Sequence, residues 1–241
     1  MVRKKVLTED GSATRFHPEY GEHYHSLSGA RQEALLRFVK PCRIIETAKS
    51  KGKLRFLDVG FGLGINVSVT LEQLFLEVPG VSCEWISLEK ELLDIEDLRP
   101  HFGTDPVFSL LESMVGSGEV STDLCKGRLL IGDARERILD LEGPFDAIFL
   151  DPFSPKKNPE MWSEGFMRAL WEVCGEGGIL STYSSAASVR LALMEAGWQI
   201  GLGPRVGRKS SGTVASKGLI DPPLPELEEK QRRSLERRLR S

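Results

Sequence analysis

One acidic residue stands where acid–base chemistry is feasible. Asp151 follows the apolar run 145–150 and opens a loop that Pro152 and Pro155 hold in one shape. A carboxylate beside an amine can orient the lone pair of the nitrogen and accept its proton. Phe153, between the two prolines, offers a ring that can stack on a flat base. We therefore predict a reaction site on this loop, against the alternative that Asp151 only caps a turn.

Three glycines form a second pattern. Gly60, Gly62 and Gly64 follow the apolar run 54–59, and glycine there permits a tight turn in which the backbone approaches a ligand. A dinucleotide fold needs its third glycine one residue later, where isoleucine stands, and the GxxxxGK[ST] phosphate loop is absent. With an acidic residue two positions before the first glycine, the turn resembles the first motif of the class I S-adenosylmethionine-dependent methyltransferases. A dehydrogenase is the weakest alternative, and a turn that serves only packing is another.

Two more carboxylates end apolar runs. Glu89 closes the run 84–89, where a carboxylate can accept hydrogen bonds from both ribose hydroxyls of a nucleoside cofactor. Asp133 follows the run 127–132, where an acceptor can meet the exocyclic amine of adenine. Glu89 could instead be a surface glutamate, and Asp133 is also a good helix N-cap. For Asp133 the two roles are compatible.

The elements that must position these residues alternate along the chain. Apolar runs at 54–59, 84–89, 127–132, 145–150 and 178–183 predict strands, and runs at 65–77, 91–98, 164–174 and 187–196 predict helices between them. Residues 198–202 and 212–216 predict a last pair of strands, while 99–123 is ambiguous. This alternation predicts an α/β fold with a mostly parallel, doubly wound sheet, which binds ligands outside the carboxyl ends of its strands.

Composition and charge limit the classes to which this protein can belong. The 241 residues include 40% hydrophobic and 28% charged residues, as in a soluble globular protein. The chain shows no apolar run long enough for a membrane and no secretory signal, so we expect a cytoplasmic protein. The four cysteines form no CxxC pair and are not clustered with histidines, so no metal is expected.

The organisation of the chain is predicted in three parts. We expect an N-terminal extension with a helix at 1–52, a catalytic domain at 53–220, and a Pro-rich spacer with a basic tail at 221–241. Residues 205–241 hold ten Lys or Arg and five Asp or Glu, in a chain whose net charge is -3. A basic end on an acidic body suits a phosphate-facing surface, or is simply a solvated helix end.

The longest distinctive stretch is LDPFSPKKNPEMW at 150–162. It resembles the methyltransferase half of the bacterial bifunctional enzyme that completes the 5-methylaminomethyl group on the wobble uridine of tRNA. Segments 61–66, 87–90, 182–186 and 207–209 agree with that family, as do Tyr24, Ser26 and Glu33, so that the resemblance runs from about residue 24 to about 209. Pro152 replaces an expected glycine, and the flavin-dependent oxidase half has no counterpart here.

The resemblance implies a class I (Rossmann-like) methyltransferase that transfers a methyl group from S-adenosylmethionine to the amine of 5-aminomethyl(-2-thio)uridine at the wobble position. It implies tRNA as the partner, and no flavin is expected because the oxidase half has no counterpart. The sequence itself gives no sign of a metal, a membrane or a partner protein. Asp151 is the implied catalytic residue. The implied cofactor-binding residues are Tyr24, Ser26, Gly60, Phe61, Gly62, Gly64, Asn66, Glu89, Lys90, Asp133, Ala134 and Asp151. The implied substrate-side residues are Pro152, Phe153, Lys156, Lys157 and Arg208.

Other functions remain open at this stage. Basic side chains at positions 156, 157, 190, 205, 208 and 209 are expected to converge near the site and contact a tRNA backbone, although any one of them could serve only solubility. The first alternative is a methyltransferase of the same fold that acts on a small-molecule or protein amine. The second is a non-enzymatic domain that binds a nucleoside.

Overall fold

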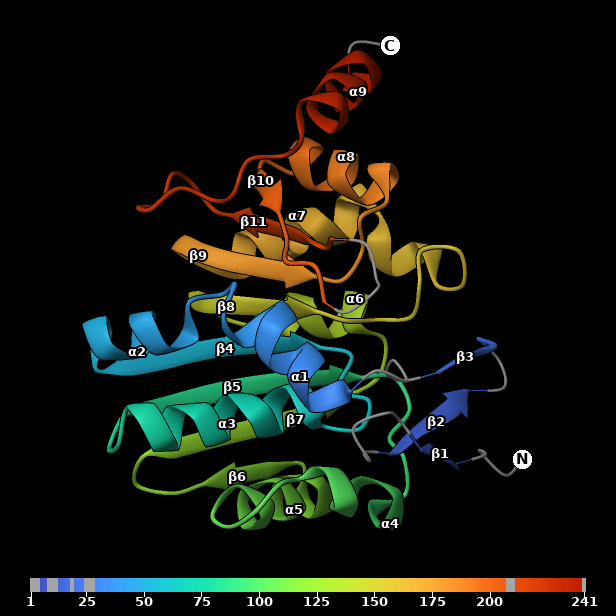
Figure 1. The fold of residues 1–241 in the computed structure, drawn as a ribbon. Helices are drawn as coiled ribbons and strands as arrows, with labels where there is room; N and C mark the ends of the chain where they lie inside the picture. The colour runs from blue at the N-terminus through green and yellow to red at the C-terminus, as the bar shows by residue number, and fades with distance from the viewer. Residues whose placement is uncertain (1–4, 8–12, 18–19, 24–28, 207–210, 240–241) are drawn as a thin grey trace.

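A central sheet organises the computed structural model, which describes residues 5–7, 13–17, 20–23, 29–206 and 211–239 (Figure 1). Its strands stand in the order β10-β11-β9-β8-β4-β5-β7-β6. Their bounds are β4 (Lys53–Val59), β5 (Ser82–Glu89), β6 (Glu119–Ser121), β7 (Cys125–Ile131), β8 (Phe145–Leu150), β9 (Cys174–Thr182), β10 (Gln199–Leu202) and β11 (Thr213–Ser216). The order reverses beside β4, which is where an open α/β sheet leaves a crevice for ligands.

The middle of the sheet is parallel and its edges are antiparallel. The strands β9, β8, β4, β5 and β7 pair in parallel, whereas β6 pairs with β7, β11 with β9 and β10 with β11 in the antiparallel sense. The predicted α/β fold and the predicted pair of late strands are therefore confirmed. Because the parallel strands run the same way, their carboxyl ends meet on the right-hand side of Figure 1.

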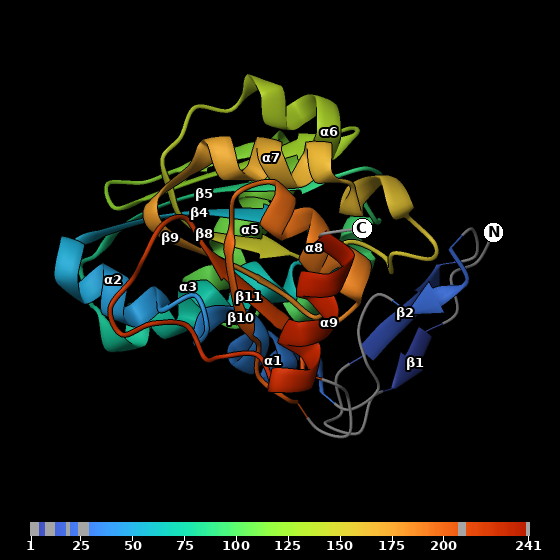
Figure 2. The ribbon, with the colours of Figure 1, turned by 90° about the horizontal axis from the view of Figure 1, so that it is seen from above.

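Helices cover both faces of the sheet, as the view from above shows (Figure 2). One face carries α1 (Ala30–Ala34), a π-helical turn (Leu35–Val39), α2 (Ile44–Lys51), α3 (Ile65–Glu77) and α5 (Val107–Ser117). The other carries α6 (Ala134–Arg137), α7 (Glu164–Val173) and α8 (Ala187–Glu195). Alternate side chains of β4 enter the two cores, with Phe56 on the first face and Leu57 on the second.

Three segments differ from the sequence expectation. The helix expected at 91–98 shortens to α4 (Ile95–Leu98), because residues 91–94 form the exit from β5. The helix expected within the N-terminal extension is interrupted after the π-helical turn, and Arg43 takes a left-handed conformation with φ 52° before α2 begins. The ambiguous segment 99–123 contains α5 and β6.

Small elements lie at the two ends of the described chain. A separate three-stranded sheet, β1 (Lys5–Leu7), β2 (Ala13–His17) and β3 (Glu22–His23), stands beside the carboxyl ends of the parallel strands (Figure 1). The helix α9 (Glu229–Leu239) docks on α8, and Leu235 of α9 is buried. None of the described helices is long and apolar enough to cross a membrane. Among the described residues, no cluster of three or more potential metal ligands occurs, and all four cysteines are free thiols.

Candidate active site

The glycine turn between β4 and α3 packs directly against the loop that follows β8. The Gly60 amide donates to the carbonyl of Leu88, at 2.9 Å. Gly60 has a φ of +94°, and a Cβ at this position would lie 2.9 Å from the backbone oxygen of Asp151. Only glycine permits this approach, so the turn and the Asp151 backbone are placed together by the absence of a side chain.

Glu89 ties the carboxyl end of β5 to the same turn. One carboxylate oxygen accepts a hydrogen bond of 2.9 Å from the amide of Gly62, and the other accepts one of 3.1 Å from the amide of Glu91. These two bonds fix the orientation of the Glu89 carboxylate at the carboxyl end of β5. This geometry suits the predicted role of Glu89 in binding a nucleoside.

Asp151 lies beside the turn, as predicted. Its amide donates to the carbonyl of Val59 at 2.9 Å, which continues the pairing of β8 with β4. Its Oδ2 accepts a hydrogen bond of 2.9 Å from the side-chain amide of Asn66, in the first turn of α3. Asn66 is buried, so its amide is fixed in place. The structure thus brings together a predicted catalytic carboxylate and a predicted cofactor-side residue.

The loop of residues 151–158, which we call the 151–158 loop, is held from several directions. The Tyr183 hydroxyl donates to the carbonyl of Pro152 at 2.8 Å, and Trp162 Nε1 donates to the carbonyl of Phe153 at 2.9 Å. Trp162 belongs to a 3-10 turn (Pro159–Trp162) and its side chain is buried, so it packs within the protein. Burial, followed by the nearby charge of Asp151, raises the pKa of Tyr183 far above its usual range. The phenol therefore stays protonated and able to donate.

The N-terminal segment contributes two residues to this region that the sequence did not single out. The ring of Tyr20 stacks on that of Phe153, with centroids 4.4 Å apart and planes 21° apart. The carboxylate of Glu22 accepts hydrogen bonds from both the amide and the hydroxyl of Ser154. No local pattern marks these contacts, because they join parts of the chain that are far apart in sequence.

A second carboxyl lies beneath the glycine turn. Asp58, on β4, is completely buried and accepts a hydrogen bond of 3.1 Å from the hydroxyl of Ser87 on β5. Burial raises the pKa of Asp58 to about 7, and the nearby charge of Glu89 also raises it, whereas the Ser87 bond lowers it. The raised pKa brings the ionisation of the Asp58 carboxyl close to neutral pH.

Asp133 takes the N-cap position of α6. Its carboxylate accepts a hydrogen bond of 2.9 Å from the amide of Arg135 and forms an ion pair with the Arg135 guanidinium. Hydrogen bonding from Arg135 is the main cause of the lowered pKa of Asp133. The capping role is confirmed, while the adenine-binding role of Asp133 and of its neighbour Ala134 stays a prediction.

Several predicted residues are placed differently from the expectation or lie outside the description. Arg190 is buried and donates to the hydroxyl of Thr213 and the carbonyl of Gly212, so it does not join the basic residues expected near the site. The side chain of Phe61 is also buried, which leaves its backbone as the part available to a cofactor. Lys156 and Lys157 are exposed on the 151–158 loop. Tyr24, Ser26, Arg208 and Lys209 lie outside the described residues.

The geometry defines a class of protein. A glycine turn after the first central strand, a carboxylate at the end of the next, and Asp151 beside the turn are the arrangement of a class I S-adenosylmethionine-dependent methyltransferase. The family model described as S-adenosyl-L-methionine-dependent methyltransferase matches residues 105–218. S-adenosylmethionine is therefore the cofactor.

Comparison with known proteins identifies the family within this class. The crystal structure of MnmC2 from Aquifex aeolicus is 40% identical, with a TM-score of 0.87, and the match covers 97% of this chain and 75% of that one. The chain belongs to the MnmC2 family. It is also 32% identical to the uncharacterized protein MJ0670 of Methanocaldococcus jannaschii over 88% of its own length and 59% of that protein's. It is 30% identical to the tRNA 5-methylaminomethyl-2-thiouridine biosynthesis bifunctional protein MnmC of Paraburkholderia xenovorans, over 80% of this chain and 32% of that protein.

Proposed function

We propose that this methyltransferase methylates the amine of 5-aminomethyl(-2-thio)uridine at the wobble position of tRNA, giving 5-methylaminomethyl(-2-thio)uridine. The observation that carries the proposal is the placement of the Asp151 carboxylate 2.9 Å from Asn66, at the point where the 151–158 loop meets the glycine turn. The name of the bifunctional relative, which includes 5-methylaminomethyl-2-thiouridine biosynthesis in tRNA, supports the choice of acceptor.

For this reaction the protein must position the two reactants and supply a base. The cofactor supplies an activated methyl group on its sulfonium. Asp151 holds the amine of the substrate, accepts its proton and keeps its lone pair in line with the methyl carbon. As the nitrogen–carbon bond forms, the sulfur–carbon bond breaks, and the proton leaves on the Asp151 carboxylate. The half-buried Phe153 ring, which Tyr20 already stacks against, offers the surface for the uracil ring. Pro152 is buried, so it shapes the loop and does not present a face to the base as the sequence had suggested.

The residues that hold the cofactor are also part of the proposal. The backbone of the Gly60–Gly64 turn faces the methionine part, and Glu89 binds the ribose hydroxyls. Asp133 and Ala134, at the start of α6, bind the adenine. Lys90 and Asn66 complete the set among the described residues, and Tyr24 and Ser26 are proposed from the resemblance alone.

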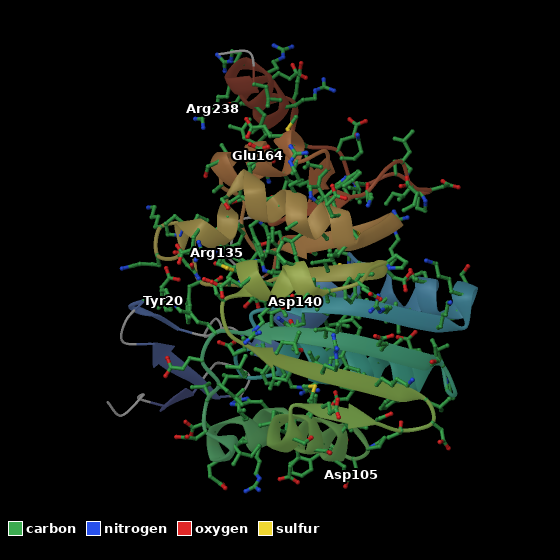
Figure 3. All side chains as sticks on the ribbon, turned by 180° about the vertical axis from the view of Figure 1, so that it is seen from behind. Tyr20, Asp105, Arg135, Asp140, Glu164 and Arg238 are labelled. Carbon is green, nitrogen blue, oxygen red and sulfur yellow. The ribbon has the colours of Figure 1, made fainter. Side chains whose placement is uncertain are left out.

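A basic surface is proposed to bind the tRNA backbone. Lys156 and Lys157 are exposed on the 151–158 loop. The helix α9 carries five Lys or Arg and two Asp or Glu among residues 229–239. Figure 3 shows Tyr20, Arg135 and Arg238 on the left-hand side of the view, which is the side of the strands' carboxyl ends. Contacts from this side would position the tRNA without reading its sequence, in the cytoplasm where tRNA is modified.

The test is methyl transfer from labelled S-adenosylmethionine to tRNA carrying 5-aminomethyluridine, followed by nucleoside analysis. A parallel reaction uses tRNA carrying the carboxymethylaminomethyl form, whose nitrogen is already substituted. We expect label in 5-methylaminomethyluridine from the first tRNA and none from the second. If neither tRNA is labelled while the cofactor binds normally, the acceptor is a small-molecule or protein amine instead.

A further inference from the structure

Tyr20 reaches both sides of the cofactor crevice. In the sheet, β4 lies between β8 and β5, so the glycine turn after β4 is flanked by the residues that follow those two strands. Tyr20 stacks on Phe153, which follows β8, and its hydroxyl lies 3.4 Å from Nζ of Lys90, which follows β5. The Lys90 ammonium also lies 6.0 Å from the centroid of the Tyr20 ring. Tyr20 therefore links side chains that follow the two strands on either side of β4.

Glu22 binds the 151–158 loop at Ser154. Its carboxylate accepts a hydrogen bond of 3.0 Å from the amide of Ser154 and a second, short one from the Ser154 hydroxyl. Two bonds to one residue fix both its backbone and its side chain, and a charged acceptor makes each of them stronger than a neutral one would. Ser154 comes three residues after Asp151, so its position constrains the direction in which the Asp151 backbone leaves β8.

Three successive residues of the loop are each anchored by a different element. Tyr183 binds the Pro152 carbonyl and Trp162 binds the Phe153 carbonyl, and both anchors belong to the strand-and-helix body of the methyltransferase fold. The third anchor, Glu22 on Ser154, comes from β3 in the small N-terminal sheet. The loop that carries Asp151 is therefore completed by a segment outside that body.

We propose that Glu22 is a positioning residue for methyl transfer, and that Tyr20 holds Glu22 in register by spanning the crevice. Glu22 acts through Ser154 on the loop and is given no contact with the reacting atoms. The inference rests on the proposed role of Asp151, and it does not depend on which amine is methylated. In-line transfer is sensitive to small displacements, because an error of about 1 Å can cost about 100-fold in rate.

The first test measures the loop itself and needs no acceptor. Hydrogen exchange of peptides covering residues 151–158 is compared in wild type, Glu22→Ala and a matched control, Glu46→Ala, on the exposed face of α2. Loss of Glu22 frees the Ser154 amide, so we expect exchange in this peptide to become about tenfold faster in Glu22→Ala and to stay unchanged in the control. Unchanged exchange in Glu22→Ala would overturn the proposal whatever the substrate is.

Tyr20 has its own pair of variants. Tyr20→Ala removes the stack on Phe153, whereas Tyr20→Phe keeps the stack and removes only the hydroxyl beside Lys90. We expect Tyr20→Ala to accelerate exchange at 151–158 as Glu22→Ala does, and Tyr20→Phe to leave most of the protection. If Tyr20→Ala leaves exchange unchanged, Tyr20 does not hold Glu22 and that part of the proposal is wrong.

The second test measures catalysis and separates positioning from folding. We expect Glu22→Ala to lower kcat by about 10- to 100-fold while the Kd for S-adenosylmethionine changes less than about threefold. Glu22→Gln, which still accepts the Ser154 amide, should recover most of the rate. Ser154→Ala removes only the hydroxyl bond and should cost less, and adding it to Glu22→Ala should cost nothing further. Additive losses, or equal losses in kcat and cofactor binding, would contradict a positioning role. If the wild type methylates neither tRNA, the proposed function fails while the exchange result still decides this inference.

Discussion

The side-chain amide of Asn66 donates a hydrogen bond of 2.9 Å to the carboxylate of Asp151. The bond joins the first turn of α3 to the loop after β8, and the buried Asn66 gives the carboxylate a fixed orientation. Because α3 starts at the end of the glycine turn, Asn66 links the turn to Asp151 through one side-chain hydrogen bond. The cofactor side and the acceptor side of the site are thus mechanically connected.

Replacing Asp151 should abolish most catalysis without removing cofactor binding. Asp151→Ala deletes the group that orients the amine and takes its proton, and a positioned base contributes about 10²–10⁴-fold to such reactions. We expect kcat to fall by at least about 100-fold, with a smaller increase in the Kd for S-adenosylmethionine measured by calorimetry. Wild-type rates in Asp151→Ala would remove Asp151 from its catalytic role.

Replacing Glu89 should weaken cofactor binding. Glu89→Ala loses the proposed ribose acceptor and also releases the Gly62 and Glu91 amides that now bind the carboxylate. We expect the Kd for S-adenosylmethionine to rise by at least about tenfold, which corresponds to about 1.4 kcal/mol, with little change in thermal unfolding. The control is Glu119→Ala on the edge strand β6. An unchanged Kd would place Glu89 outside the cofactor site.

Asp58 should make the free protein less stable as pH rises toward neutral. Its pKa rises from 3.8 to about 7 on folding, so between about pH 4 and 7 the unfolded chain loses a proton that the folded chain keeps. The free energy of unfolding therefore falls across this window by about 4 kcal/mol at most. Above the pKa of the folded state, Asp58 contributes no further change.

The matching variant is Asp58→Asn, which cannot ionise. Urea unfolding from pH 4.5 to 8.5 should show Asp58→Asn gaining stability relative to wild type as pH rises, with most of the gain reached by about pH 7.5. Parallel curves for the two proteins would mean that Asp58 stays ionised in the folded state.

The helix α9 should contribute to tRNA binding through charge. Arg233 and Arg232 form ion pairs with Glu229 and Glu236 of the same helix, so the variants chosen are Lys230→Ala and Arg237→Ala. We expect each to raise the KM for tRNA a few-fold and together to reduce the slope of log K against log salt by about one to two. The control Arg99→Ala removes an arginine that pairs with Glu96 and Glu112. If the slope of log K against log salt is unaltered, α9 does not contact the RNA.

Local pattern was sufficient to predict most of the central sheet. The run 145–150 became β8 with the predicted bounds, and Asp151 had to lie at the carboxyl edge because β8 pairs in parallel with β4. Glu89 was placed by the same reasoning. Residues 91–94 show where local pattern fails. Their sequence pattern predicted the start of a helix, but in the structure they form the loop that leaves β5.

Contacts between distant segments were not predictable from one sequence. Tyr20 and Glu22 reach the site only because the N-terminal sheet folds back onto the 151–158 loop. Arg190 was wrongly expected to be exposed near the site because its side chain is charged. In the structure it is buried, and hydrogen bonds to Thr213 and Gly212 compensate for the loss of water. Burial also lowers the pKa of Arg190, in keeping with this enclosed position.

The bond between Glu22 and Ser154 spans 132 residues of sequence. During synthesis Glu22 leaves the ribosome first, and at about 5–20 residues per second its partner follows on the order of ten seconds later. For that interval the N-terminal segment has no partner on the 151–158 loop. The contact that completes the 151–158 loop can therefore form only after the β4–α3–β5 unit has been synthesised.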